Sequence, residues 1–242
     1  MRIQKVILVL IVIAALLAPN SAQAQSTSTS SDYQGRGPQC RLPESNAEGL
    51  EILSNYYPGY WWDHTDLTIA VQAHPSATPA QLDAVHGAIE TWSDLLDDCF
   101  DGLITLTDVT DGKKKHRTHV DIILHYNPTQ GGVSYEGYAV CGDHKCNNII
   151  VSSDYPPSTG IPPSDPEYIG WVTLHELGHA LGLGHTTNLW ESTDIMGYGW
   201  PTLGEPVLSD CNVDALRFVF AWVFEGSEPH PPAQGPYDCS LD

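Results

Sequence analysis

The eleven residues from His175 to His185 constrain this chain more than any other segment. They read His-Glu-Leu-Gly-His-Ala-Leu-Gly-Leu-Gly-His. His175 and His179 are four residues apart, so a helix places both imidazoles on one face, one turn apart. Glu176 follows His175 and is rotated from it by about 100° around the helix axis. Its carboxylate can therefore reach the side of an ion shared by the two imidazoles without ligating it. The segment predicts a zinc site with an acid beside it.

The end of the same segment supplies a third ligand. Glycine adopts the left-handed conformation that ends helices, so Gly182 predicts a sharp turn that brings His185 back to the same ion. Three protein ligands leave a fourth zinc position for water, which is the arrangement of a catalytic site. The alternative is a helix with two exposed histidines and an unrelated loop histidine. The joint pattern of His, Glu, His, Gly and His disfavours that alternative.

Residues 194–198, Asp-Ile-Met-Gly-Tyr, place a methionine in a glycine-containing turn after the third histidine. The chain has 2 methionines, and the other is Met1. A zinc motif followed by such a turn resembles the metzincin metallopeptidases. Residues 175–185 are most similar to the matrixin, or matrix metalloproteinase, family. The aspartate pair that begins the last matrixin helix would fall at Cys211 and Asn212, so a matrixin-type salt bridge from a new N-terminus is not expected.

The resemblance implies an α+β fold of the metzincin catalytic type. A twisted mixed β-sheet and two helices lie above the cleft in that family, and a small C-terminal subdomain with one helix lies below it. It also implies that His175, His179 and His185 bind zinc, that Glu176 is the catalytic base, and that Met196 forms the floor of the site. Tyr198 is similar to a tyrosine of astacins and serralysins that stabilises the oxyanion. A packed turn aromatic is the alternative for Tyr198.

Periodicity predicts secondary structure that agrees with this order. A capping box at Thr78-Pro79-Ala80-Gln81 begins a helix whose apolar positions continue to Leu96. The zinc helix is expected over residues 168–181, and Ser209 is expected to cap a last helix that carries Phe220 and Val223. The expected strands are 67–71, 103–109, 119–125, 135–141 and 148–152.

The N-terminus has the layout of a secretory signal peptide. Arg2 and Lys5 precede an apolar run from Val6 to Leu17, and Ala22-Gln23-Ala24 form a small-residue cleavage site. An uncleaved N-terminal anchor is the alternative. We therefore expect a secreted, extracellular protein with a signal peptide at 1–24, a flexible Ser/Thr-rich segment at 25–45, the catalytic domain at 46–226 and a Pro-rich tail at 227–242.

All 6 cysteines follow the expected cleavage site. An even number in a secreted chain predicts disulfides. Cys141 and Cys146 flank a short loop and are the expected first pair, while four others would tie the tails to the domain: Cys40, Cys99, Cys211 and Cys239. The alternative for Cys40 is a thiolate that caps the zinc, because residues 38–44 faintly resemble the matrixin cysteine switch.

The formal net charge of −20, with 30 acidic and 10 basic residues, disfavours nucleic acid and anionic membranes as partners. We expect a monomer that acts on a protein or peptide substrate. After signal cleavage we expect no membrane partner. One catalytic Zn²⁺ is the expected cofactor. Calcium is kept open, although no binding loop is evident. A second metal site at His119, Asp121, His125 and His144 is disfavoured by their spacing.

These observations predict a zinc-dependent endopeptidase in which Glu176 activates water for peptide hydrolysis. Two alternatives remain. One is a catalytically inactive zinc-binding protein with an adhesive or inhibitory role. The other is a metal-dependent amidase that acts on non-protein substrates. Binding alone needs no acid at position 176, which favours the enzyme.

Overall fold

The computed structural model describes Cys40 and residues 51–53, 61–110, 120–127, 137–142, 145–152, 164–186, 193–197, 205–232 and 236–238. These residues all belong to one compact unit, Tyr33–Asp242. The expected signal peptide, most of the segment at 25–45, Tyr198 and Cys239 lie outside the described residues, as do His119 and His144.

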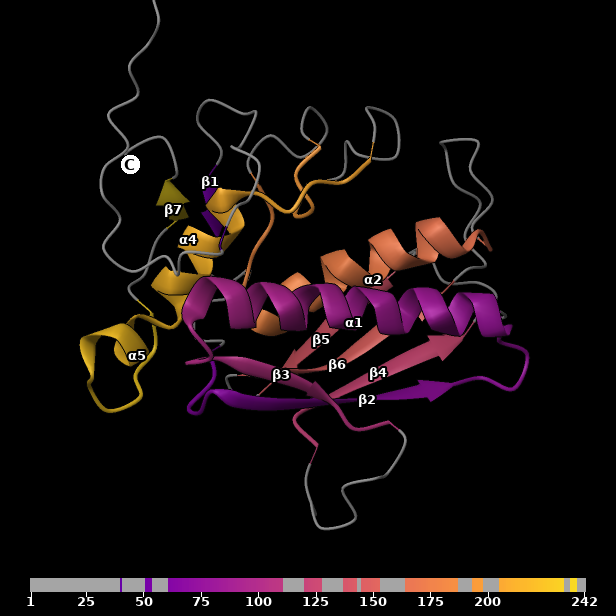
Figure 1. The fold of residues 1–242 in the computed structure, drawn as a ribbon, viewed down its shortest axis with the longest axis horizontal. Coiled ribbons are helices and arrows are strands. Elements are labelled where there is room, and N and C mark those ends of the chain that lie inside the picture. Colours follow the sequence, from indigo (N-terminus) through magenta and orange to yellow (C-terminus); the bar gives the residue numbers. More distant parts are fainter. Residues whose placement is uncertain are drawn as a thin grey trace, which may run out of the picture. The chain divides into compact units, whose positions relative to one another are not determined.

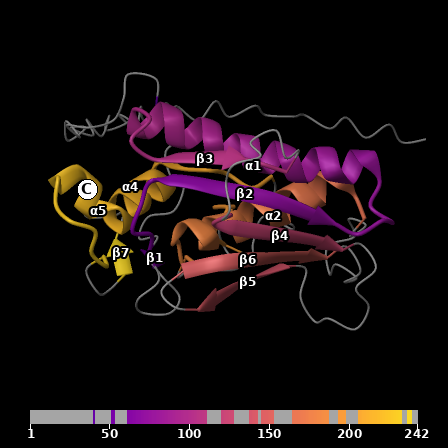
Figure 2. The ribbon, with the colours of Figure 1, turned by 90° about the horizontal axis from the view of Figure 1, so that it is seen from below.

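A mixed five-stranded sheet forms the centre of this unit. Its order is β3 (Thr105–Asp108), β2 (Asp66–Ala73), β4 (Ile122–Asn127), β6 (Lys145–Ser152) and β5 (Gly137–Gly142). The pairs β2–β3, β2–β4 and β4–β6 are parallel, and the outermost strand β5 is antiparallel to β6. Figure 2 shows the five strands side by side in this order. The predicted α+β class with a mixed sheet is confirmed.

Two helices cover one face of the sheet, as Figure 1 shows. Helix α1 (Pro79–Phe100) packs against β3 and against α2 (Pro166–Leu181), and α2 packs against β5 and β6. The predicted capping box begins α1: the Thr78 hydroxyl accepts from the Gln81 amide, and the Gln81 side chain accepts from the Thr78 amide. The apolar stripe of α1 is buried against the alternate strand residues that face it, among them Ile69 and Leu124.

The C-terminal part contains α4 (Asp210–Val219), α5 (Ala221–Glu225) and a two-stranded antiparallel pair of β1 (Glu51–Leu53) with β7 (Pro236–Asp238). The expected single helix after Ser209 is interrupted at Phe220, whose φ of −101° and ψ of 28° are not helical. An interruption of one residue leaves the apolar spacing almost unchanged, so the sequence pattern does not reveal it.

Two disulfides link segments of this unit, one at the end of α1 and one in the β5–β6 hairpin. Cys141 and Cys146 are bonded across the β5–β6 hairpin, which confirms the expected pair. Cys40 is bonded to Cys99 near the end of α1, so it is not a thiolate that caps a metal in this structure. Cys211 is also disulfide-bonded. No helix among the described residues has the length and apolar character needed to cross a membrane.

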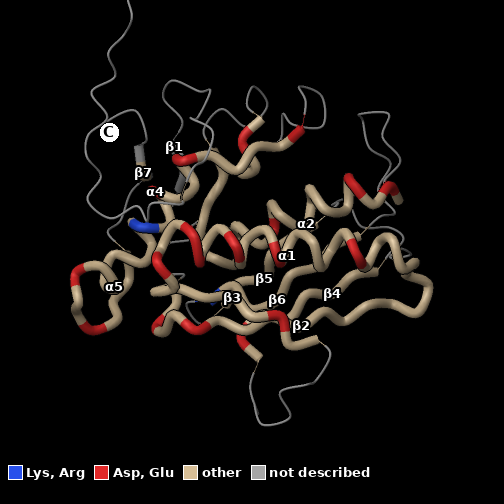
Figure 3. The backbone as a smooth tube through the Cα atoms, viewed as in Figure 1, with Lys and Arg blue, Asp and Glu red and all other residues tan. Residues whose placement is uncertain are grey.

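Acidic residues outnumber basic ones along the described backbone, as Figure 3 shows. Lys145 and Arg217 are the basic residues of the described ranges, and each has an internal partner. The Lys145 ammonium lies 2.8 Å from an Asp63 carboxylate oxygen, and the Arg217 guanidinium donates to the Cys99 carbonyl at 2.6 Å.

Candidate metal centre

Helix α2 carries the first two histidines, and its ends are defined by local chemistry. The Asp165 carboxylate accepts from the Glu167 amide at the N-terminus, and Pro166 occupies the first turn. The helix ends at Leu181, because Gly182 has the left-handed conformation (φ 110°) that glycine adopts without strain. The predicted turn at Gly182 is therefore confirmed, and His185 follows it on the returning chain.

The structure brings the three histidines together. The Nε2 atom of His185 lies 3.2 Å from that of His175 and 3.0 Å from that of His179. The three imidazole nitrogens that could bind a metal, one from each histidine, all lie within 4.8 Å of one another. Residues from one helix face and from the turn after it thus present their imidazoles to a single point.

Two of these rings are oriented by the backbone. His175 Nδ1 lies 2.6 Å from the Ile195 carbonyl oxygen, and His179 Nδ1 lies 2.8 Å from the Leu183 carbonyl oxygen. A carbonyl oxygen can only accept, so each Nδ1 carries the hydrogen and each Nε2 presents a lone pair. Converging lone pairs repel one another unless a cation lies between them. Three imidazole nitrogens that converge on one point fit a zinc ion, and the Nδ1 bonds of His175 and His179 are of the kind that fixes the orientation of metal-binding histidines.

Burial keeps these imidazoles neutral. The pKa of His179 is lowered to about 4, and that of His185 to about 3, in both cases chiefly by desolvation. The pKa of His175 is lowered well below its usual value by desolvation and by the neighbouring rings. A neutral imidazole is the form that binds a metal, so the site excludes the proton that would compete with it.

The lowered pKa values predict a pH dependence for the metal-free protein. Unfolded histidines take up protons as the pH falls below about 6.5, whereas the folded imidazoles do so only near 4 and below. The unfolded state therefore binds more protons in this window, and the free energy of unfolding should fall as the pH falls from 7 to 5. Urea unfolding in the presence of a chelator measures this, and H185N should show a shallower decline. A free energy of unfolding that rises towards pH 5 in the wild type but not in H185N would contradict the assignment.

Met196 is fully buried and packs against α2. A Cβ atom at Gly178 would overlap the Met196 sulfur, so the helix approaches the methionine closely only because residue 178 has no side chain. The turn containing Met196 also holds the histidine segment, since the Met196 carbonyl accepts from the Thr186 amide at 3.1 Å. Met196 therefore packs against α2 at Gly178, and its role as the floor beneath the histidines stays a prediction.

A buried carboxylate organises this turn, and sequence analysis did not find it. One oxygen of Asp194 accepts from the Met196 amide at 2.8 Å and from the Asn212 amide group at 3.1 Å. The other accepts from the Ser209 hydroxyl at 2.9 Å. Burial raises the pKa of Asp194, and these hydrogen bonds oppose that rise. Asn212, where the matrixin pattern expects an aspartate, therefore joins α4 to the turn through an amide.

Glu176 points from α2 towards the edge strand β5. Its side chain is 5% exposed and lies directly against Gly137, the first residue of β5. Tyr198, the second residue proposed for catalysis, lies outside the described residues. The structure therefore positions the predicted base but leaves the role of Tyr198 as a prediction.

Two tryptophans hold α2 in place; the sequence predicted Trp92 only as an apolar position of α1, and it gave no role to Trp62. Trp92 Nε1 donates to the Leu174 carbonyl at 2.9 Å, and Trp62 Nε1 donates to the Ala180 carbonyl at 2.8 Å. Both indoles are buried. Because they bond the backbone on either side of His175 and His179, they limit how far the helix can shift.

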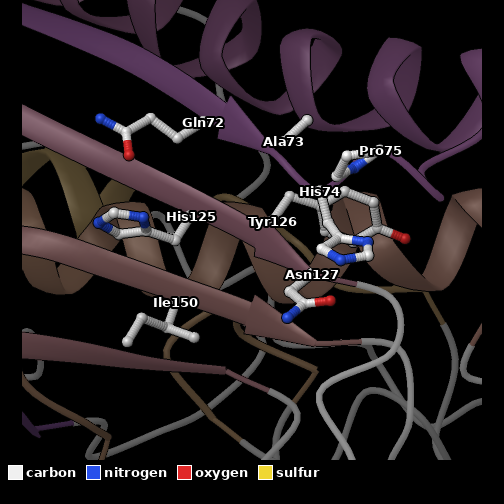
Figure 4. Close-up of a pocket in the computed structure, with 8 residues that line it drawn as sticks. All are labelled: Gln72, Ala73, His74, Pro75, His125, Tyr126, Asn127 and Ile150. Carbon is white, nitrogen blue, oxygen red and sulfur yellow. The ribbon is translucent and has the colours of Figure 1, made fainter.

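Asp121 and His125, the two other candidate ligands that the structure describes, do not form a second centre with other described residues. Asp121 precedes β4 and accepts from the Thr68 amide and hydroxyl at 2.8 and 2.6 Å. His125 lies between Gln72 and Ile150 of the neighbouring strands, in a hollow of about 470 Å³ shown in Figure 4. Within the described ranges, the three histidines of the metal centre are the one group of His, Cys, Asp or Glu residues able to share an ion. The described residues give no support for calcium, which the sequence left open.

Comparisons with known proteins give only distant similarity. No family model and no curated protein matches the chain. Among solved structures, it is similar to archaemetzincin from Methanopyrus kandleri, with 16% identity over 63% of this chain and 94% of the other, at a TM-score of 0.42. It is also similar to metalloproteinase-II from Bacteroides fragilis, with 17% identity over 75% of this chain and 58% of the other, at a TM-score of 0.42.

A third similarity is to high choriolytic enzyme 1, a hatching-enzyme zinc protease of the medaka fish Oryzias latipes. Its identity is 18% over 52% of this chain and 50% of the other, at a TM-score of 0.31. This chain thus spans about half the length of that enzyme. Similarities of this size assign neither a subfamily nor a substrate, so the functional argument depends on the site itself.

Proposed function

We propose that this chain is a zinc-dependent endopeptidase. The observation that carries the proposal is the convergence of three neutral imidazoles on one point, with Glu176, which is buried, next to His175 in the same helix. His175, His179 and His185 would hold the ion. Three histidine ligands leave a coordination position open, which distinguishes a catalytic zinc site from a structural one.

When bound, Zn²⁺ supplies Lewis acidity, which polarises the substrate carbonyl and lowers the pKa of water towards about 7. Glu176 accepts the proton of the attacking water and returns it to the leaving amine nitrogen. Its carboxylate is suited to this task because α2 and β5 enclose it and so limit its motion. Tyr198 is proposed to stabilise the oxyanion, on the resemblance of residues 194–198 to the turn of astacins.

The outermost strand β5 is the proposed binding edge for substrate. An extended peptide can add to a sheet edge through main-chain hydrogen bonds, and β5 begins beside Glu176. This would bring a scissile peptide bond across the site. It favours a protein or peptide substrate over a small amide, which would need no such edge.

Matrixin-like ancestry, secretion and a monomeric state remain parts of this proposal. Secretion is supported by the signal-like N-terminus and by the disulfides at Cys40, Cys99, Cys141 and Cys146, which persist in oxidising compartments. Recovery of the protein from culture medium with its N-terminus at Gln25 would support cleavage after Ala24. Retention in the membrane would support the uncleaved anchor.

Digestion of an unfolded protein substrate tests the activity. We expect new peptide amino termini to form, cleavage to stop when a chelator removes the metal, and activity to return with added Zn²⁺. A protein that binds zinc but releases no amino termini would be the inactive zinc-binding protein. Hydrolysis of small or cell-wall amides without protein cleavage would instead identify an amidase.

A further inference from the structure

The first residue of β5, Gly137, lies on the strand face that is turned towards α2. Gly137 pairs with Val151 across the antiparallel ladder, and Val151 is fully buried on the helix-covered face of the sheet. Residues opposite each other in such a ladder share a face. A side chain at position 137 would therefore point towards α2.

That space is already occupied. A Cβ atom at Gly137 would lie 2.7 Å from Glu176 Cγ, 2.8 Å from Glu176 Oε1 and 2.8 Å from Val172 Cγ1. Real Cβ atoms essentially never approach other heavy atoms within 3.0 Å. The backbone of β5 thus forms one wall of the space that holds the Glu176 side chain.

The helix is poorly placed to relieve such an overlap. Trp92 and Trp62 bond the backbone carbonyls of Leu174 and Ala180, and Gly178 packs on Met196. Movement of α2 would disturb all three contacts at once. The Glu176 side chain itself has rotatable bonds, so a new group at position 137 would displace the carboxylate before it displaces the histidines.

We propose that Gly137 is a positioning residue for Glu176: the absence of a side chain at this point of β5 sets where the carboxylate stands. This inference rests on the proposed function for its catalytic consequence. Its structural content, a packing contact between position 137 and Glu176, stands independently of catalysis.

The test compares G137A with G87A in the purified, zinc-loaded protein. Gly87 lies in α1, outside the proposed substrate edge, neither glycine has a positive φ, and a Cβ at Gly87 meets nothing within 4 Å. We expect G137A to lower kcat on the order of 100-fold, as a displacement of about 1 Å can, with KM within about threefold and zinc content unchanged. G87A should keep the wild-type kcat. Wild-type kcat in G137A would overturn the inference.

A second pair of variants separates Glu176 from Val172. V172A removes the overlap with Val172 Cγ1 and leaves both overlaps with Glu176, so G137A/V172A should keep the low kcat of G137A. If V172A restores kcat fully, the loss came from Val172 and the inference fails.

Thermal unfolding of the metal-free protein tests the contact without relying on catalysis. In the metal-free protein, G137A should lower Tm by roughly 3–10 °C, and by less than half as much in an E176A background. Equal shifts in the two backgrounds would overturn the inference. If G137A fails to fold, E176A should restore folding of the double variant, and rescue by V172A alone would count against Glu176.

These outcomes distinguish the two proposals. A wild-type protein without peptidase activity would remove the proposed function, while the unfolding cycle would still report whether position 137 contacts Glu176. An active wild type with an unaffected G137A would remove the inference alone.

Discussion

Replacing Glu176 with glutamine is expected to lower kcat for peptide hydrolysis by about 10²–10⁴ while zinc content stays unchanged. Glutamine has the size and shape of glutamate, so it should keep the packing against Gly137 and Val172. It cannot accept a proton from water at neutral pH. The loss should therefore lie in catalysis and not in folding or metal binding. Steady-state kinetics and metal analysis of the same preparation measure both quantities.

Glu167 offers a matched control on the same helix. It is exposed in the first turn of α2, about two helical turns before His175. E167Q should retain wild-type kcat. Peptidase activity that survives in E176Q would contradict the proposed role of Glu176, and zinc loss in E176Q would show that the carboxylate contributes to the metal site instead.

The parts of the site that the sequence predicts are those coded locally. His175, His179 and Gly182 act through helix geometry and a left-handed turn, both of which depend on neighbouring residues. The capping box at Thr78 is equally local, and it begins α1 where expected. Such features can be read from spacing because few other arrangements satisfy the same backbone constraints.

The parts that the sequence does not predict depend on contacts between distant residues. Trp62 is 118 residues from Ala180, and Trp92 is 82 residues from Leu174. Gly137 has no local role that would mark it, since its φ is not positive and the close approach of Glu176 and Val172 explains the glycine. Side-chain packing of this kind becomes visible only when the elements are placed together.

The start of strand β4 also depends on a contact between residues distant in the sequence. The predicted strand over residues 119–125 begins at Ile122 in the structure, because Asp121 turns to accept from Thr68 of β2. A hydrogen bond to a neighbouring strand outweighed the local pattern.

Replacing Asp194 with alanine is expected to be among the most destabilising single changes near the site. Its carboxylate accepts from the Met196 amide, the Ser209 hydroxyl and the Asn212 amide group, all buried. Leaving these donors unsatisfied should lower the free energy of unfolding by about 3–5 kcal/mol. Urea unfolding of the metal-free protein measures this. D194N keeps the shape and one acceptor oxygen, so it should lose less than half as much.

The same substitution should weaken zinc binding although Asp194 is not a ligand. The turn it holds carries the Ile195 carbonyl, which accepts from His175 Nδ1 at 2.6 Å. Loss of such an orienting bond typically costs 10–100-fold in metal affinity. N212A supplies a control, because its effect should shrink in a D194A background if both act through one network. Additive effects of the two changes, with zinc affinity unaltered in D194A, would show that the network stabilises α4 alone and does not reach the histidines.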